Sequence, residues 1–243
     1  MYSDADAAAL YDIVSPWDGE RFPADRFYDE LVLAAESVLD VGCGTGSMLR
    51  QARERGHRGR LAGFDPDGDR LAIARRREDV EWRRAVAVEA GWDAEFALAT
   101  MTSHAFQCLV TDAELRSSLT AIRAALRPGG RFAFETRHPQ ARAWRDWNPG
   151  NAAEVTDATG RVLRAWHEVQ SVIDDVVTFT GTTAEPDGTV LRVDTTSLRF
   201  LDESTLDLFL DEAGFDIDAR YGDWDASPVT GTSTEIITIA RRP

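Results

Sequence analysis

Residues 38–46 read Val-Leu-Asp-Val-Gly-Cys-Gly-Thr-Gly, and this stretch decides the fold. An apolar run from Ser37 to Val41 leads into a cluster of three glycines, and Met48 to Arg55 then has helical character. A strand, a tight loop and a helix in this order form the unit at which open α/β sheets bind ligands. Glycine suits the loop because a Cβ would block the close approach of a ligand to the backbone.

The alternation of strands and helices continues as far as Pro139. Strands are predicted over Leu61–Phe64, Val80–Arg83, Phe96–Met101 and Arg131–Glu135, with helices over Asp67–Arg77 and Asp112–Leu126. Thr111 or Asp112 suits the N-cap of the second helix, and Glu114 places a carboxylate in its first turn. Alternation of this kind builds a parallel sheet with helices on its faces.

The sequence pattern changes after Pro139. Residues 161–172, 176–183 and 190–200 are rich in β-branched side chains, which predicts three antiparallel strands joined by hairpins. The alternation of helix and strand then resumes, with a helix predicted over Glu203–Ala213 and strands over Phe215–Tyr221 and Glu235–Ala240. No repeat or low-complexity linker interrupts it, so we expect one domain over residues 1–243 with an insertion at residues 140–200.

Composition narrows the classes of function. The formal net charge of −15 would repel a phosphate backbone and argues against a nucleic-acid substrate, although acidity that serves only solubility is equally compatible. No apolar run approaches the roughly 20 residues of a membrane helix, and residues 1–10 do not read as a secretory signal. Cys43 and Cys108 fit no metal-ligand or redox spacing. We therefore expect a cytoplasmic protein without a metal or a membrane partner.

The glycine cluster and a second acidic strand end define a family. VLDVGCGTG, followed about 20 residues later by Asp65, resembles the class I S-adenosylmethionine-dependent methyltransferases of the small-molecule type. The resemblance extends from Ser37 to Pro139 and includes the segment IRAALRPGGRFAFE. The spacing is GxGxG, and Ser47 stands where a dinucleotide fingerprint has its third glycine, which disfavours a nicotinamide-dependent reductase.

The resemblance implies a fold. We expect an α/β, Rossmann-like, doubly wound sheet of seven mostly parallel strands, with the last strand antiparallel and the antiparallel β insertion after the fifth. Residues 1–36 resemble the helical cap that such enzymes fold over the cofactor. Residues 140–200 resemble the substrate lid of glycine and amino-sugar N-methyltransferases.

The resemblance also implies how the cofactor is held. Gly42, Gly44 and Gly46 would let the backbone pass close to it, and Asp40 would order the loop or receive its ammonium. Asp65 would accept hydrogen bonds from both ribose hydroxyls. The remaining cofactor contacts are assigned to Tyr11, Trp17, Phe64, Pro66, Ala87 and Met101.

The adenine subsite departs from the family. Many members place an acidic residue after the third strand, and this chain has Val86 there, within RRAVAVEAGW. Two alternatives remain open. Glu89 takes the role through a shifted loop, or apolar packing and backbone contacts such as the amide of Ala87 hold the adenine.

Catalytic candidates follow the fourth and fifth strands. Methyl transfer from a sulfonium needs alignment and exclusion of water, and it needs a base only where the acceptor must lose a proton. His104 and His138 are the catalytic candidates, and Glu135 and Arg137 are candidates for acceptor binding. A histidine bonded to a helix end and a solvated loop are the plain alternatives.

Aromatic residues suggest the walls of the site. Tyr11 and Trp17 could shield the sulfonium through cation–π contact, and Trp144 and Trp166, with Trp147, could line an acceptor pocket. Core or interface packing is the alternative for each of them.

The sequence thus predicts a methyltransferase that passes a methyl group from S-adenosylmethionine to an O or N atom of a small-molecule metabolite. The alternative is a cofactor-binding regulatory or scaffolding protein without transferase activity. The hairpins could equally bury an apolar face against a second copy, so a homodimer stays open.

Overall fold

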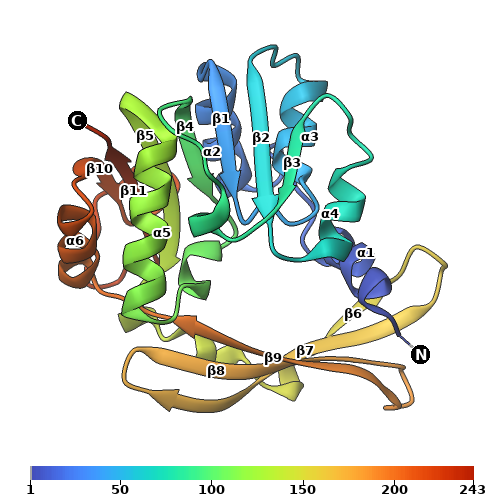
Figure 1. Cartoon of the computed structure of the whole chain (residues 1–243). Coiled ribbons are helices and arrows are strands. Elements are labelled where there is room, and N and C mark those ends of the chain that lie inside the picture. The colour runs from blue at the N-terminus through green and yellow to red at the C-terminus, as the bar shows by residue number, and fades with distance from the viewer. Residues whose placement is uncertain (1) are drawn as a thin grey trace.

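The computed structural model describes residues 2–243 and contains two sheets (Figure 1). The larger has seven strands in the order β10-β11-β5-β4-β1-β2-β3. Their bounds are β1 Ser37–Val41, β2 Arg60–Asp65, β3 Glu81–Arg84, β4 Phe96–Met101, β5 Leu126–Arg137, β10 Asp216–Tyr221 and β11 Glu235–Arg241. All pairings are parallel except those of β11, which is antiparallel to β5 and β10. The predicted fold is confirmed.

Helices cover both faces of this sheet. Their bounds are α1 Asp4–Val14, α2 Pro23–Ala34, α3 Ser47–Glu54, α4 Gly68–Ala74, α5 Asp112–Ala125 and α6 Glu203–Glu212. Short 3₁₀ turns also occur within residues 2–243: η1 Ala87–Glu89, η2 Ala105–Cys108, η3 Pro139–Ala141, η4 Ala143–Asp146 and η5 Pro149–Asn151. Buried residues of α2 and α3 pack with one face of the sheet, and those of α5 and α6 pack with the other. None of the helices within residues 2–243 is long and apolar enough to cross a membrane.

Helix α5 shows how local sequence sets an element. Thr111 is its N-cap: its hydroxyl accepts the Glu114 N–H at 3.2 Å, and the Glu114 carboxylate accepts the Thr111 N–H at 2.9 Å. This capping box satisfies two of the unpaired donors of the first turn. Leu115, Leu119 and Ile122 then bury one stripe of the helix against the sheet. Of the two predicted N-caps, Thr111 is therefore the one used.

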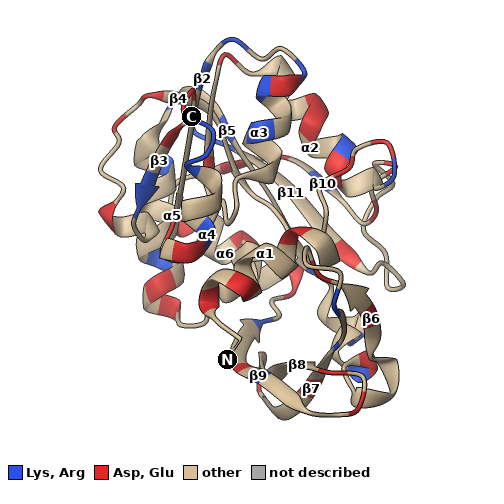
Figure 2. Cartoon of the chain, turned by 90° about the vertical axis from the view of Figure 1, so that its right-hand side faces the viewer, with Lys and Arg blue, Asp and Glu red and all other residues tan. Residues whose placement is uncertain are grey.

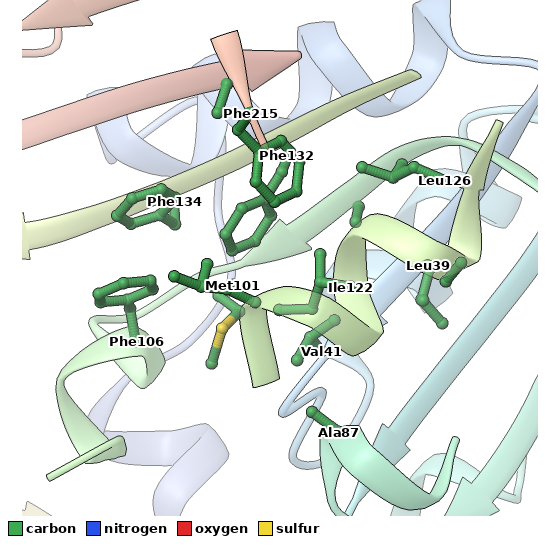
Figure 3. Packing of buried hydrophobic residues seen from close by; sticks show 14 of the residues in the cluster. Leu39, Val41, Ala87, Met101, Phe106, Ile122, Leu126, Phe132, Phe134 and Phe215 are labelled. Carbon is green, nitrogen blue, oxygen red and sulfur yellow. The ribbon is translucent and has the colours of Figure 1, made fainter. Parts of the chain in front are cut away.

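An aromatic stack joins the core to the sheet edge where the parallel strands end (Figure 3). The rings of Phe106 and Phe134 lie 4.2 Å apart at 13°, and Phe132 stacks on Phe134 at 4.8 Å. Phe106 belongs to η2, which follows β4, whereas Phe132 and Phe134 belong to β5. Burial of such rings fixes the start of η2 against the core.

The second sheet is antiparallel, with the order β6-β7-β8-β9. Its strands are β6 Ala153–Thr156, β7 Val162–Ile173, β8 Val176–Ala184 and β9 Val190–Arg199. It lies opposite the edge at which β1 and β2 end (Figure 1). The prediction of three strands was wrong by one, because β6 is four residues long and mostly exposed, which leaves little apolar pattern to read.

The N-terminal segment divides into two parts. In α2, Tyr28 and Val32 are buried in the apolar cluster shared with α3 and the sheet, so this helix belongs to the sheet layer. Helix α1 instead contacts α4, and its Leu10 packs with Leu163 of β7. The predicted cap over residues 1–36, of which Met1 lies outside the described residues, stays a prediction.

Charge is distributed without a single dominant element. Figure 2 shows acidic and basic positions interspersed along helices and loops on one side of the molecule. Many of them pair, as Arg60 does with Glu81 at 2.8 Å and Arg116 with Asp112 at 3.0 Å. Such exposed pairs contribute little each to stability.

Candidate active site

A cavity of about 590 Å³ opens at the edge where β1, β2 and β4 end. This volume lies within the range of about 300–1,000 Å³ that is typical of small-molecule sites. Its lining includes Tyr11, Trp17, Asp40, Gly42, Gly44, Thr45, Phe64, Asp65, Pro66, Arg70, Val86, Ala87, Val88, Met101, Ser103, Ala105, Cys108 and Glu114. The strand ends predicted to bind the cofactor thus meet at one hollow.

The three glycines of the loop adopt the left-handed conformation. Gly42, Gly44 and Gly46 have φ values of +73°, +54° and +74°. Gly42 and Gly44 line the cavity. At Gly46, a Cβ would lie 2.4 Å from Cη2 of Trp82, so this glycine admits the indole of β3. The third glycine of the motif therefore serves packing under the loop.

Asp65 ends β2 and organises the loop around it. Its Oδ2 accepts the Gly44 N–H at 2.8 Å, and its Oδ1 accepts the Asp67 N–H at 2.8 Å. A carboxylate has about four acceptor positions, so two are left after these bonds. The Asp65 carboxylate lines the cavity and can accept hydrogen bonds from hydroxyl groups there.

Asp40 is a buried acid at the end of β1. Thr100 Oγ1 donates to its Oδ1 at 3.0 Å, and the side chain lines the cavity. Burial raises the pKa of Asp40 to about 7, opposed by the Thr100 hydrogen bond and reinforced by the charges of Asp65 and Glu135. A buried carboxylate with a raised pKa favours a cationic ligand, because the positive charge would offset the cost of keeping the carboxylate ionised away from water.

The departure after β3 leaves an apolar wall. Val86, Ala87 and Val88 line the cavity, and both valines are exposed. The Glu89 carboxylate accepts the Val86 N–H at 3.3 Å, and the described residues that line the cavity do not include Glu89. This favours the alternative in which apolar packing holds the adenine.

Tyr11 and Trp17 reach the cavity from the N-terminal segment. Arg70 lies over the Tyr11 ring, 4.6 Å from its centroid. The indole N–H of Trp17 donates to Asp29 Oδ1 at 3.0 Å, and Asp29 also pairs with Arg55. These contacts fix both rings at the rim of the cavity.

Helix α1 is also bonded directly to the glycine loop. Asp12 Oδ1 accepts Thr45 Oγ1 at 2.5 Å and Ser47 Oγ at 3.3 Å, and Arg50 lies 3.6 Å from Asp12 Oδ2. Sequence reasoning missed Asp12, because its partners lie more than thirty positions away along the chain. The acidic first half of α1 gave no hint of which carboxylate would be used.

The two catalytic candidates have partners within the protein. His104 Nε2 lies 2.9 Å from Glu235 Oε2, and His138 Nδ1 accepts the Gln140 N–H at 3.1 Å. Neither is among the described residues that line the cavity, although Ser103 and Ala105 beside His104 are. Their catalytic role remains a prediction.

The acceptor-binding candidates lie beyond the cavity wall. Glu135 is buried, and both of its oxygens accept hydrogen bonds, from Tyr28 and from the His104 N–H. Burial raises the pKa of Glu135, and the hydrogen bond from Tyr28 opposes this. Arg137 donates to Gln107 Oε1 at 3.1 Å and lies over the Trp147 ring at 5.7 Å.

The remaining two candidates belong to the insertion. Trp144 packs edge-on against Phe200 at 4.6 Å, in line with the packing alternative. Trp166 is half-buried on β7, opposite Thr182 of β8. Neither is among the described residues that line the 590 Å³ cavity, so the structure separates the cofactor candidates from the acceptor candidates.

Comparison with known proteins identifies a related family. Residues 38–130 match the sequence profile of the family named Methyltransferase domain. This segment is therefore similar to methyltransferase domains. A comparison with curated protein sequences finds no match.

Solved structures resemble the chain over nearly its whole length. An S-adenosylmethionine-dependent methyltransferase from Clostridium acetobutylicum has 16% identity and a TM-score of 0.77, with 97% of each chain covered. An amino pentose methyltransferase from Micromonospora echinaspora has 22% identity and a TM-score of 0.71, with 100% of this chain and 98% of that chain covered. A sugar N-methyltransferase from Streptoalloteichus has 21% identity and a TM-score of 0.70, with 96% and 93% covered. At these identities the similarity establishes the fold, including the antiparallel insertion.

Proposed function

We propose that the 590 Å³ cavity binds S-adenosylmethionine and that the enzyme transfers its methyl group to an O or N atom of a small-molecule metabolite. One observation carries the proposal: two acidic strand ends, Asp40 and Asp65, face the same cavity beside the left-handed glycines Gly42 and Gly44. Two carboxylates in one cavity suit a ligand that carries both an ammonium and vicinal hydroxyls.

The residues divide the work of binding. Asp40 would hold the ammonium of the donor, and Asp65 its ribose hydroxyls, with Phe64, Pro66 and the residues 86–88 around the adenine. Met101, Tyr11 and Trp17 would surround the sulfonium and exclude water. S-adenosylmethionine supplies the electrophilic methyl group, and the protein supplies alignment.

The acceptor would enter from the side of the antiparallel sheet. Glu135, Arg137, Trp144 and Trp166 remain our candidates for binding it, and the predicted cap and lid remain proposals for the domain organisation. His104 would act as a base where the acceptor is a protonated amine, with Glu235 holding its ring at 2.9 Å. His138 is the second candidate for this role.

The solved relatives suggest which acceptors to test first. The titles of two of them describe methyltransferases of an amino pentose and of a sugar nitrogen. We therefore propose amino sugars as the first acceptor class, ahead of hydroxyl acceptors. No observation favours the alternative of a binding protein without transferase activity.

The proposal is tested by calorimetric titration with S-adenosylhomocysteine, with NADH as the control ligand. Saturable binding of S-adenosylhomocysteine alone, lost in Asp65→Ala, would support the cofactor site. Transfer of a radiolabelled methyl group from S-adenosylmethionine to an amino sugar would then support the activity. Absence of binding to the wild-type protein would refute the site, and binding without transfer to amine or hydroxyl acceptors would refute the activity.

A further inference from the structure

The turn between β4 and η2 has an unusual backbone. Ser103 and His104 are consecutive residues other than glycine with φ values of +56° and +61°. The left-handed conformation costs such residues roughly 1–2 kcal/mol each. Two in succession persist only where surrounding contacts hold them.

A buried carboxylate provides such a contact. Glu135 is 2% exposed, and its Oε1 accepts the backbone N–H of His104 at 2.8 Å. Its Oε2 accepts the hydroxyl of Tyr28, a residue of α2 that is 1% exposed. A hydrogen bond from a backbone amide to a charged, water-excluded acceptor is among the stronger ones in proteins.

The same turn forms part of the cavity wall. Thr102, Ser103 and Ala105 all line the 590 Å³ cavity. On its far side the turn continues into η2, where Phe106 stacks on Phe134 at 4.2 Å. A Cβ on Gly42 would lie 3.4 Å from the Cβ of Ala105, so η2 also abuts the glycine loop. A shift of the turn would therefore alter the wall and the loop together.

We propose that Glu135, held by Tyr28, is a positioning residue that clamps the left-handed Ser103–His104 turn and thereby preforms one wall of the cofactor cavity. In this role Glu135 acts on the cofactor cavity through the His104 amide, without direct contact with the donor. The clamp links α2, β5 and β4, three elements far apart in the sequence, at the point where the cavity needs a fixed backbone. The inference rests on the proposed function in one respect, because it is measured through binding of S-adenosylhomocysteine.

The test separates a backbone clamp from a general structural role. Glu135→Ala should weaken the binding of S-adenosylhomocysteine about tenfold, since the free protein then relaxes the turn and must restore it on binding. Adding His104→Gly should recover most of this loss, because glycine adopts φ > 0 without strain. Adding His104→Ala, which removes the same ring but retains the strain, should recover none. Glu135→Gln keeps an acceptor oxygen and should stay within about threefold of the wild type.

Other outcomes would overturn the clamp. Wild-type affinity in Glu135→Ala, or equal recovery by glycine and alanine at position 104, would show that the turn does not depend on Glu135. Where Glu135→Ala does not fold, Tyr28→Phe serves instead, with faster amide hydrogen exchange in residues 102–108 as the expected result and unchanged exchange as the refuting one. Failure of the wild-type protein to bind S-adenosylhomocysteine would instead refute the proposed function.

Discussion

The two halves of the sheet edge differ in what their polar side chains bind. At the ends of β1 and β2, Asp40 and Asp65 face the cavity with acceptor capacity to spare. At the ends of β4, β5 and β11, Glu135 accepts the Tyr28 hydroxyl and the His104 N–H, and the His104 ring pairs with Glu235. The first half is arranged for a ligand, whereas the second is arranged to hold its own backbone. Polar residues at strand ends are therefore not equivalent, even at one edge of one sheet.

The largest expected effect is at Asp65. Asp65→Ala should weaken S-adenosylhomocysteine binding by about 100-fold or more, because the two charge-assisted hydrogen bonds that we propose to the ribose would each be worth about 1.5–3 kcal/mol. Calorimetry measures the loss. Asp202→Ala is the matched control, since Asp202 caps α6 through the Thr205 N–H at 2.8 Å and is not among the described residues that line the cavity. A loss at Asp65 no larger than at Asp202 would break the contrast between the two halves.

Gly46 tests whether the motif serves only the ligand. Gly46→Ala should lower the free energy of unfolding by about 2–4 kcal/mol, through left-handed strain and the clash with Trp82. Gly56→Ala is the control, because Gly56 has φ +92° with nothing within 4 Å, and it should lose only about 1–2 kcal/mol. Urea denaturation measures both. Equal losses would show that the indole of Trp82 moves aside.

The pH dependence of binding reports on Asp40. With a pKa of about 7 in the free protein, Asp40 becomes protonated as the pH falls through 7, and a ligand ammonium prefers the ionised form. The affinity for S-adenosylhomocysteine should therefore fall about tenfold between pH 8 and pH 6. Asp40→Asn should bind more weakly with a flat profile over this range. A wild-type profile that is equally flat would place the ammonium elsewhere.

Asp12 tests the contact of α1 with the glycine loop. Asp12→Asn should weaken S-adenosylhomocysteine binding about fivefold, since the bonds from Thr45 and Ser47 lose a charged acceptor worth about 1 kcal/mol. Asp4→Asn removes the partner of Arg192 at the other end of the same helix and should leave affinity unchanged. Equal effects of the two substitutions would show that α1 acts by charge alone.

Trp166 provides the smallest expected effect on the cofactor. Trp166→Ala should change the affinity for S-adenosylhomocysteine less than about twofold while raising the KM of an acceptor severalfold. Trp17→Ala, at the cavity rim, should instead weaken the binding of S-adenosylhomocysteine. Steady-state kinetics with an amino sugar as acceptor, in which the methylated product is followed, would measure the change in KM. A loss of cofactor affinity in Trp166→Ala would mean that the antiparallel sheet closes over the donor.

The half of the sheet edge at β1 and β2 could be predicted from sequence because the residues that form it lie close together along the chain. Asp40, Gly42 and Gly44 lie within five positions, and Asp65 ends the next strand, so strand and loop periodicity alone brings them to one edge. The residues singled out there, from Tyr11 to Met101, line the cavity, apart from Gly46. The four-residue β6 escaped prediction because a short, exposed strand has almost no hydrophobic pattern.

The contacts in the other half, at the ends of β4, β5 and β11, depend on tertiary structure. Sequence reasoning selected Glu135 and His104 as residue types suited to chemistry, but it could not foresee that Tyr28, 107 positions away from Glu135, would take one of its oxygens. Nor could it foresee two consecutive left-handed residues at 103 and 104, since neither is glycine. Local sequence determines which elements form and where a glycine loop must bend, because those preferences act within a few residues. Which buried donor meets which acceptor depends on how distant elements pack, and the chain shows this only once it is folded.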